Sequence, residues 1–409
     1  MKHSLALKIL SGILLPLALA SCSSGQATHA SQAMTTTSSK ASSSQASQSS
    51  SSAASSSSAG SSASSTTQTG AARISMIAVG DNLIHDSVMK IAQTSNSYNF
   101  APFYTHMESY IANADISFIN QESMMAGAQF GYSGWPRFNA PQQLGYTVRS
   151  LGFNIVNLAN NHALDRGADG VVDNAKFWDG LGVAHIGTNE NAQQQGTAAI
   201  LNIKGIRVAF LGYTSSTNGI PLPSGKTWLV DMIDKTQMAA DVKRAKQDAD
   251  CVIVSLHWGN EFHHEYSTQQ KQLAEYLASI GVDVIIGTHP HVIEPVEWIT
   301  AANGHRMLVY YSLGNFISYQ TKIDTMLGAM ASFDIVKASD GSVTIQNAKA
   351  MPLVTHYEGL NTLEIYPLSQ YTNALAARHS IKNYGKPASV SYFTGLAKSI
   401  LGSFYSTGK

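Results

Sequence analysis

The chain has 409 residues and carries 26 basic and 26 acidic side chains. Three of the basic residues, Lys2, Lys8 and Lys40, fall in the first 72 residues, which hold no acidic residue, so the remaining 337 residues carry 23 basic and 26 acidic side chains. A net charge of about −3 over that length, without a basic arm or patch, argues against nucleic-acid binding through phosphate neutralisation. Beyond the N-terminus, no apolar run is long enough to span a bilayer.

The first 21 residues have the pattern of a secretory signal peptide. Lys2 and Lys8 precede a short apolar run over residues 9–20, which small residues follow. Leu19-Ala20-Ser21-Cys22 resembles a bacterial lipobox, in which the cysteine is lipidated. We therefore expect a lipoprotein signal peptide over residues 1–21 and a lipid anchor on Cys22 that holds the protein at the extracytoplasmic face of the cell membrane. The alternative is an ordinary signal peptide that contains a cysteine by chance.

The segment that follows is poor in residues that can form a core. Residues 23–72 are rich in Ser, Ala, Gln and Thr, with one charged residue, Lys40, and no apolar side chain larger than Met34. Such a segment cannot bury enough apolar area to offset its ordering entropy. We therefore predict a disordered linker over residues 22–72, with a typical reach of about 40 Å for about 50 residues.

From residue 73 onward, β-branched apolar runs alternate with helical patterns. Strands are expected over 74–79, 115–120, 153–158, 208–211, 252–256 and 284–286, and helices over 142–151, 167–181, 235–248 and 268–280. Continuously apolar strands separated by helices predict an α/β domain whose strands are covered on both faces. Cys251, in the apolar run 251–254, is expected to be a buried thiol.

The last third of the chain has a different pattern. Residues 307–311, 329–336 and 342–349 follow one another without helices and predict an antiparallel addition. Residues 368–409 predict one or two helices. We therefore expect the main domain to span residues 73–367, with a C-terminal helical extension over 368–409.

Polar residues of a few types follow five of the expected strands. In chain order these residues are Asp81 with His85, Glu122, Asn161 and His162 with Asp165, His257, and His289 with His291. Ligands bind beyond the carboxyl ends of the strands in open α/β sheets. Nitrogen and oxygen ligands without thiolates suit Mn, Fe, Zn or Mg, and two such ions can activate water and clamp an oxyanion.

Each of these residues also has a simpler interpretation. A lone histidine after a strand is more often a hydrogen-bonded surface residue than a ligand, Asp81 could cap a helix, and Asn161 could serve a turn. His289 and His291 differ from a lone histidine because residues two apart on an extended segment point the same way. The pair is therefore expected to reach one site.

Six motifs together resemble the bacterial capsule synthesis protein CapA family. They are Gly80-Asp81, Asn120-x-Glu122, the segment from Asn157 to Gly167, His257-Trp258-Gly259, Gly287-x-His289-Pro290-His291 and Ser312-Leu313-Gly314-Asn315-Phe316. That family is associated with poly-γ-glutamate capsule production and is related to the calcineurin-like metallophosphoesterases. The resemblance runs from about residue 74 to about residue 318 and implies a four-layer α/β/β/α metallophosphoesterase-like sandwich.

The resemblance also implies roles for single residues. The metal ligands would be Asp81, Glu122, Asn161, His257, His289 and His291, with two divalent ions as the expected cofactor. His162 would face the substrate, and Asp165 would orient it. Leu83 stands where the related enzymes have a histidine, and His85 could replace that ligand at a different spacing.

Two functions remain open at this stage. The first is an extracytoplasmic metal-dependent hydrolase that acts in the synthesis or export of poly-γ-glutamate or another surface polymer. The second is a non-catalytic, membrane-tethered scaffold that binds the polymer or its synthase and export complex. The absence of a histidine at Leu83 favours the second.

Overall fold

The computed structural model describes residues 71–408 of the chain. The expected signal peptide, Cys22 and all but the last two residues of the expected linker lie outside the described residues. The first described strand begins at Ala72. Within residues 71–408, no helix combines the length and the apolar character needed to cross a membrane.

The first sheet has eight strands in the order β14-β13-β12-β1-β2-β3-β4, with β11 paired to β1. Their bounds are β1 (Ala72–Asn82), β2 (Ile116–Asn120), β3 (Ile155–Asn157), β4 (Ala184–Ile186), β11 (Asn315–Ile317), β12 (Leu327–Lys337), β13 (Val343–Glu358) and β14 (Thr362–Pro367). Strands β1 to β4 pair in parallel, whereas β12 to β14 are antiparallel. Strand β1 joins the two halves, because it pairs in parallel with β2 and antiparallel with β12.

The second sheet has six strands in the order β5-β6-β7-β8-β10-β9. Their bounds are β5 (Ala199–Ile203), β6 (Ile206–Thr214), β7 (Cys251–His257), β8 (Val284–Thr288), β9 (Val296–Thr300) and β10 (Arg306–Tyr310). The four central strands are parallel, and the edge strands β5 and β9 are antiparallel. The expected antiparallel addition is confirmed for β12 and β13, but residues 307–311 do not belong to it. They form β10 of the second sheet, parallel to β8 and antiparallel to β9.

Eight α-helices accompany these sheets within the described residues. Their bounds are α1 (Asp86–Ala92), α2 (Glu108–Ala112), α3 (Gln143–Leu151), α4 (Gly167–Leu181), α5 (Lys235–Asp248), α6 (Thr268–Ser279), α7 (Asn373–Arg378) and α8 (Val390–Leu401). The four helices expected before residue 300 are confirmed to within one residue at each end. Local signals explain where two of these helices begin. The side chain of Asp234 caps the start of α5, and Ser267 forms a capping box with Gln270 at the start of α6.

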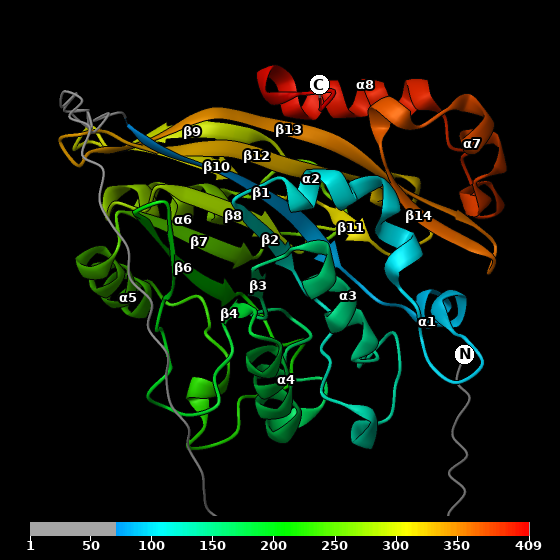
Figure 1. Ribbon diagram of the computed structural model, residues 1–409, viewed down its shortest axis with the longest axis horizontal. Helices are drawn as coiled ribbons and strands as arrows, with labels where there is room; N and C mark the ends of the chain where they lie inside the picture. Colours follow the sequence, from blue (N-terminus) through cyan, green and yellow to red (C-terminus); the bar gives the residue numbers. More distant parts are fainter. Residues whose placement is uncertain (1–70, 409) are drawn as a thin grey trace, which may run out of the picture. The chain divides into compact units, whose positions relative to one another are not determined.

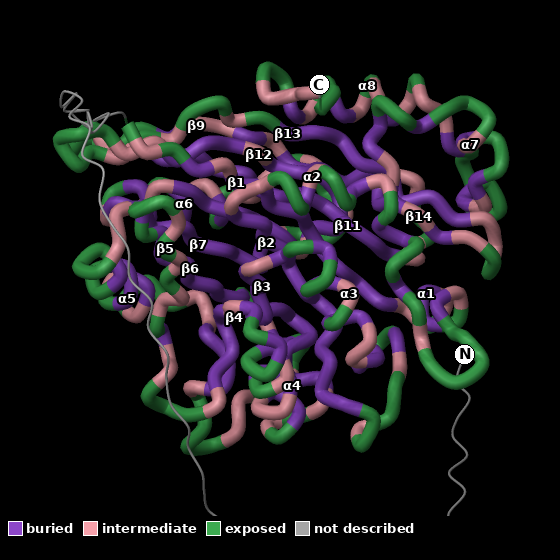
Figure 2. Tube along the Cα trace, viewed as in Figure 1, coloured by how far each residue is buried: buried purple, intermediate pink, exposed green. Residues whose placement is uncertain are grey.

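Alternating side chains of the second sheet face two different cores. In β7, Cys251 and Ile253 belong to the core shared with the first sheet, whereas Val252 packs with Val242 of α5 and Leu277 of α6. Helices α3, α4 and α8 pack against the first sheet from the other side (Figure 1). The result is the expected four-layer α/β/β/α sandwich, whose strands are largely buried (Figure 2). Cys251 is fully buried, as predicted.

Strand register places the candidate site residues side by side at the C-terminal ends of the strands in each sheet. In the first sheet, Asp81 lies beside Asn120, and Asn120 beside Asn157. In the second sheet, His257 lies beside Thr288. The ends of the two sheets therefore present polar side chains from segments far apart in the sequence.

Candidate metal centre

Two side-chain amides, those of Asn157 and Asn120, form a row of hydrogen bonds that ends on the carboxylate of Asp81 at the end of β1. Asn157 Nδ2 donates to Asn120 Oδ1 at 2.7 Å, and Asn120 Nδ2 donates to Asp81 Oδ1 at 2.7 Å. All three residues are buried. The second oxygen of Asp81 accepts the backbone N–H of His289 at 3.3 Å and lies 3.2 Å from Nδ1 of His291. One carboxylate oxygen is thus held by the first sheet, and the other faces the loop after β8.

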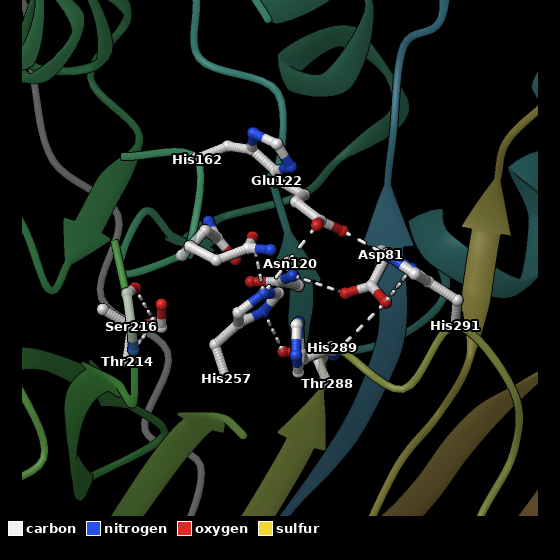
Figure 3. Close-up of polar contacts among 12 residues, drawn as sticks. Asp81, Asn120, Glu122, His162, Thr214, Ser216, His257, Thr288, His289 and His291 are labelled. Atoms are coloured by element: carbon white, nitrogen blue, oxygen red, sulfur yellow. Dashed lines mark hydrogen bonds and ion pairs between the residues drawn. The ribbon is translucent and has the colours of Figure 1, made fainter. Parts of the chain in front are cut away.

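Two groups of side chains are arranged to hold a cation, and both include Glu122 (Figure 3). One group consists of Asp81, Glu122 and His291, and the other of Glu122, His257 and His289, with ligand atoms within 4.8 Å of one another in each group. Glu122 Oε1 lies 3.8 Å from His257 Nε2, and Glu122 Oε2 lies 3.8 Å from His291 Nδ1. The two carboxylate oxygens of Glu122 therefore face one group each.

Glu122 lacks hydrogen-bond partners in the described part of the chain. Both of its carboxylate oxygens are fully buried and accept no hydrogen bond within residues 71–408. Burial raises the pKa of Glu122 well above its usual range; nearby His291 lowers it, and the charges of Asp81 and Glu261 raise it again. A buried carboxylate without a partner is costly unless a positive charge neutralises it. A divalent cation held by these residues would neutralise this carboxylate, so the residues present fit a metal.

The histidines of the second group are in the form that binds metals. Burial and the nearby histidines lower the pKa of His257 well below its usual range, and burial together with His291 lowers the pKa of His289 to about 4. Both rings are therefore neutral near pH 7. His257 Nε2 lies 3.0 Å from Asn161 Oδ1, and Thr288 Oγ1 lies 3.1 Å from His257 Nδ1. Asn161 thus lies beside the ligand atom of His257.

The pKa of His291 is shifted in the opposite direction from those of His257 and His289. Burial lowers its pKa, but the carboxylates of Glu122 and Asp81 outweigh burial and raise the pKa to about 9. Without a cation, His291 is the positive charge that partly balances the two carboxylates. Binding of a metal to this group would displace that proton, as ligand deprotonation requires.

The segment from His289 to His291 is a turn, so the expectation of an extended segment is wrong. His289 has φ 98° and His291 has φ 60°, both in the left-handed region that non-glycine residues rarely adopt. The carbonyl of Pro290 accepts the backbone N–H of Phe262 at 2.8 Å, which holds the turn. Because of this turn, His289 and His291 belong to two different ligand groups, both of which include Glu122.

His162 lies outside both ligand groups and is oriented by Asp165. Nδ1 of His162 donates to Asp165 Oδ2 at 2.8 Å, and the same oxygen accepts the backbone N–H of Phe138 at 2.6 Å. The ring of Phe138 packs edge-on against His162 at 4.6 Å between centroids. His162 borders a pocket of about 310 Å³, which places it where it can contact a bound molecule.

His85 also lies outside the two ligand groups. Its Nδ1 accepts the backbone N–H of Tyr319 at 3.2 Å, and its ring packs edge-on against Phe138. Burial and the nearby His291 lower its pKa to about 4. Leu83, at the position where the resemblance implied a histidine ligand, is buried and offers no polar side chain.

The structure adds site residues to which the sequence interpretation gave no role. Asn315 Oδ1 lies 3.1 Å from His291 Nδ1, and Asn315 stands in a motif that we quoted without assigning a function. Trp135, Arg137 and Glu261 line the pocket beside His162. These three residues lie in irregular segments, where no periodic pattern indicates which side chains face a site.

The sequence matches the family model described as "Bacterial capsule synthesis protein PGA_cap" over residues 75–320. It is 28% identical over 272 residues to the capsule biosynthesis protein CapA of Bacillus anthracis, which covers 64% of each chain. It is 30% identical over 205 residues to the PGA biosynthesis protein CapA of Bacillus subtilis (strain 168), which covers 47% of this chain and 50% of the relative. The matched regions thus span less than two thirds of these relatives.

Two solved structures superpose on part of the chain. The crystal structure of a 5'-nucleotidase precursor from Thermus thermophilus superposes with a TM-score of 0.42 and 14% identity, over 69% of this chain and 54% of that one. The NAD nucleotidase of Haemophilus influenzae gives a TM-score of 0.45 and 11% identity, over 81% of this chain and 67% of that one.

Proposed function

Because this chain belongs to the family of bacterial capsule synthesis proteins, we propose that it acts in the synthesis or export of poly-γ-glutamate or a related surface polymer through a metal-dependent hydrolase-like site. The observation that carries the proposed site is the buried carboxylate of Glu122, which has no hydrogen-bond partner in residues 71–408 and lies between two groups of ligand atoms.

The residues that would hold one or two divalent cations are Asp81, Glu122, Asn161, His257, His289 and His291. Mn, Fe, Zn or Mg suits this set of nitrogen and oxygen ligands, and a bound cation would supply Lewis acidity toward an oxyanion and toward water. His162 would provide the proton for the leaving group. Because Asp165 holds Nδ1 of His162, Nε2 is the atom that can carry that proton.

Metal content tests the proposed site directly. The purified full chain is expected to retain Mn, Fe or Zn by elemental analysis and to hydrolyse members of a panel of phosphoesters, nucleotides and γ-glutamyl peptides. Removal of the metal with a chelator should abolish hydrolysis, and adding one metal back should restore it. A chain that stays metal-free after aerobic purification and metal supplementation would contradict the proposal.

A second candidate is a non-catalytic scaffold for the polymer or its synthase and export complex. Leu83 supports it, since a buried apolar side chain occupies the position where related enzymes have a histidine. In that case the metal would be structural, and polymer output would not depend on His162.

We further propose that Cys22 carries a lipid anchor that holds the domain at the outer face of the cell membrane. A diacylglyceryl group offers two buried chains, which is enough for stable attachment where one chain is marginal. Replacing Cys22→Ser is expected to abolish lipid labelling and to leave the protein uncleaved or released into the medium. If the Cys22→Ser protein were processed and membrane-bound like the wild type, the lipobox interpretation would be wrong.

A further inference from the structure

The side-chain amide of Asn315 is fixed in one orientation at the start of β11. Asn315 is buried, and its Nδ2 has four acceptors: the carbonyl oxygens of His291 at 3.3 Å and Thr325 at 3.1 Å, Gln320 Oε1 at 2.8 Å and Ser318 Oγ at 3.1 Å. Backbone carbonyls only accept hydrogen bonds, so exchanging the amide nitrogen and oxygen would place an oxygen against two carbonyl oxygens. The position of Oδ1 is therefore set by the fold.

Three oxygens converge on one nitrogen of His291. Asn315 Oδ1 lies 3.1 Å from Nδ1 of His291, and the same nitrogen lies 3.2 Å from Asp81 Oδ2 and 3.8 Å from Glu122 Oε2. Within residues 71–408, Asn315 Oδ1 accepts no hydrogen bond other than the one from His291. A cation bound by Nδ1 takes the place of the hydrogen on this atom. The oxygens that surround this hydrogen are therefore the ones placed to bind the cation.

Two glycines allow β11 to carry Asn315 close to Asp81. The strands pair in parallel with Asp81 beside Asn315, and the N–H of Asp81 donates to the carbonyl of Gly314 at 2.9 Å. A Cβ atom on Gly80 would lie 1.8 Å from that carbonyl oxygen, so only glycine permits this approach. The N–H of Leu83 also donates to a carbonyl of β11, at 3.0 Å. Asn315 thus reaches the ligand group of Asp81 from the strand that runs beside Leu83.

An amide oxygen has the same place in the other ligand group. Asn161 Oδ1 lies 3.0 Å from Nε2 of His257, just as Asn315 Oδ1 lies 3.1 Å from Nδ1 of His291. Carboxamide oxygens are ligands for ions such as Mg and Mn, which favour oxygen. Each group has three residues with acidic or imidazole ligand atoms, so one amide oxygen in each brings both groups to four side chains.

We propose that Asn315 is itself a metal ligand, and that its Oδ1 completes the group of Asp81, Glu122 and His291 in place of the histidine missing at Leu83. This inference rests on the proposed function, because it concerns the same metal site. It also removes an argument for the scaffold, since Leu83 leaves no ligand position empty when Asn315 fills it. The alternative is that Asn315 only accepts a hydrogen bond from His291 and orients its ring.

Titration of the metal-free full chain with Mn²⁺, followed by electron paramagnetic resonance, tests the inference. Asn315→Ala is expected to lower the affinity for Mn²⁺ by at least about 10-fold, because loss even of a residue that only supports a ligand costs about 10- to 100-fold. At saturating Mn²⁺, the Asn315→Ala protein should carry one more water ligand than the wild type, measured by signal broadening in isotopically labelled water. Loss of a residue that only orients His291 would leave the number of water ligands unchanged.

Thermal unfolding with and without Mn²⁺ separates a ligand from a residue that only supports the fold. The Asn315→Ala protein should lose much of the rise in Tm that Mn²⁺ gives the wild type. Asn189→Ala is the matched control, because Asn189 is also buried, donates to the carbonyl of Trp228 at 2.7 Å and to Asp231 Oδ1 at 3.1 Å, and belongs to neither ligand group. Its Tm should fall equally with and without Mn²⁺, and its Mn²⁺ affinity should match the wild type.

An Asn315→Ala protein with the Mn²⁺ affinity or the number of water ligands of the wild type would overturn the inference. If that protein does not fold, a crystal structure of the Mn²⁺-loaded wild type provides the test: a direct bond from Asn315 Oδ1 to an ion supports the inference, and its absence overturns it. A wild-type chain that binds no Mn²⁺ would reject the proposed metal site and this ligand with it. A wild-type chain that binds Mn²⁺ without Asn315 would reject this inference alone.

Discussion

Replacing Glu122→Gln is expected to remove the bound metal and to abolish hydrolysis. Glu122 is the one carboxylate common to both ligand groups found in residues 71–408, and its two oxygens face one group each. An amide keeps the shape of the side chain but cannot provide two anionic ligand atoms. Elemental analysis and turnover measurements on the same preparation check the result, and metal content close to that of the wild type would contradict it.

Thermal unfolding with and without a chelator gives this prediction a second readout. A metal present at about 1,000 times its Kd stabilises the folded state by about 4 kcal/mol, so chelation should lower the Tm of the wild type. The Tm of the Glu122→Gln protein should not respond to the chelator. Without metal, its Tm should equal or exceed that of the metal-free wild type, because the substitution removes a buried carboxylate that accepts no hydrogen bond among the described residues.

Glu294 provides a matched control for this experiment. It is also fully buried, its pKa is raised by burial to about 8, and one of its oxygens lacks a partner within residues 71–408. Its other oxygen accepts a hydrogen bond from Gln270 at 2.8 Å, and it belongs to neither ligand group. The Glu294→Gln protein is therefore expected to keep its metal and its chelator-dependent Tm.

Replacing His162→Ala is expected to lower turnover by about 10²- to 10⁴-fold while leaving the metal content unchanged. His162 lies outside both ligand groups but borders the pocket, so the loss should fall on proton transfer rather than on metal binding. Asp165→Asn should cause a smaller loss, since it weakens the orientation of His162 and keeps the ring. His305→Ala, at a histidine whose Nε2 lies 2.7 Å from the carbonyl of Val282, is the control.

The same variant separates the two candidate functions in cells. If the protein acts by catalysis, a stable and metal-loaded His162→Ala protein should fail to support polymer production. If it acts as a scaffold, polymer output from that protein should match the wild type. Protein abundance and metal content must be measured in parallel, because loss of the protein would reduce output under either function.

The sequence predicted the four longer helices before residue 300 and the central strands well, because their patterns are local, but it missed the short helices α1 and α2. Helices α4 and α5 have the expected bounds, since an apolar stripe with clear end signals identifies a helix without tertiary information. Strands β3, β4 and β11 have three residues each, and such short segments are defined by pairing with neighbours. The assignment of β10 to the second sheet depends on its contact with β8, which no local pattern indicates.

The candidate site was predictable in its residue types but not in its geometry. Polar residues after strand ends identified Asp81, Glu122 and His257, whose side chains the structure brings together. The left-handed conformation of His289 and His291 follows from tertiary contacts, including the hydrogen bond from Phe262 to Pro290, that periodicity does not encode. The pocket residues Trp135, Arg137 and Glu261 were missed for a similar reason, because they come from irregular segments.

The position of β1 in the first sheet determines when the domain can fold. Ala72 pairs with Lys337, 265 positions later in the chain, and residues 72–79 of β1 have no partner on that side until β12 has been made. Strand β11, which comes shortly before β12, pairs only with Asp81 and Asn82 at the end of β1. At about 5–20 residues per second, synthesis of the intervening chain takes on the order of 10 to 50 s. A nascent or truncated chain that ends before Leu327 exposes the edge of an apolar strand, which is prone to aggregation. Folding of this domain is therefore a property of the finished chain, and its first strand is among the last parts to reach its native environment.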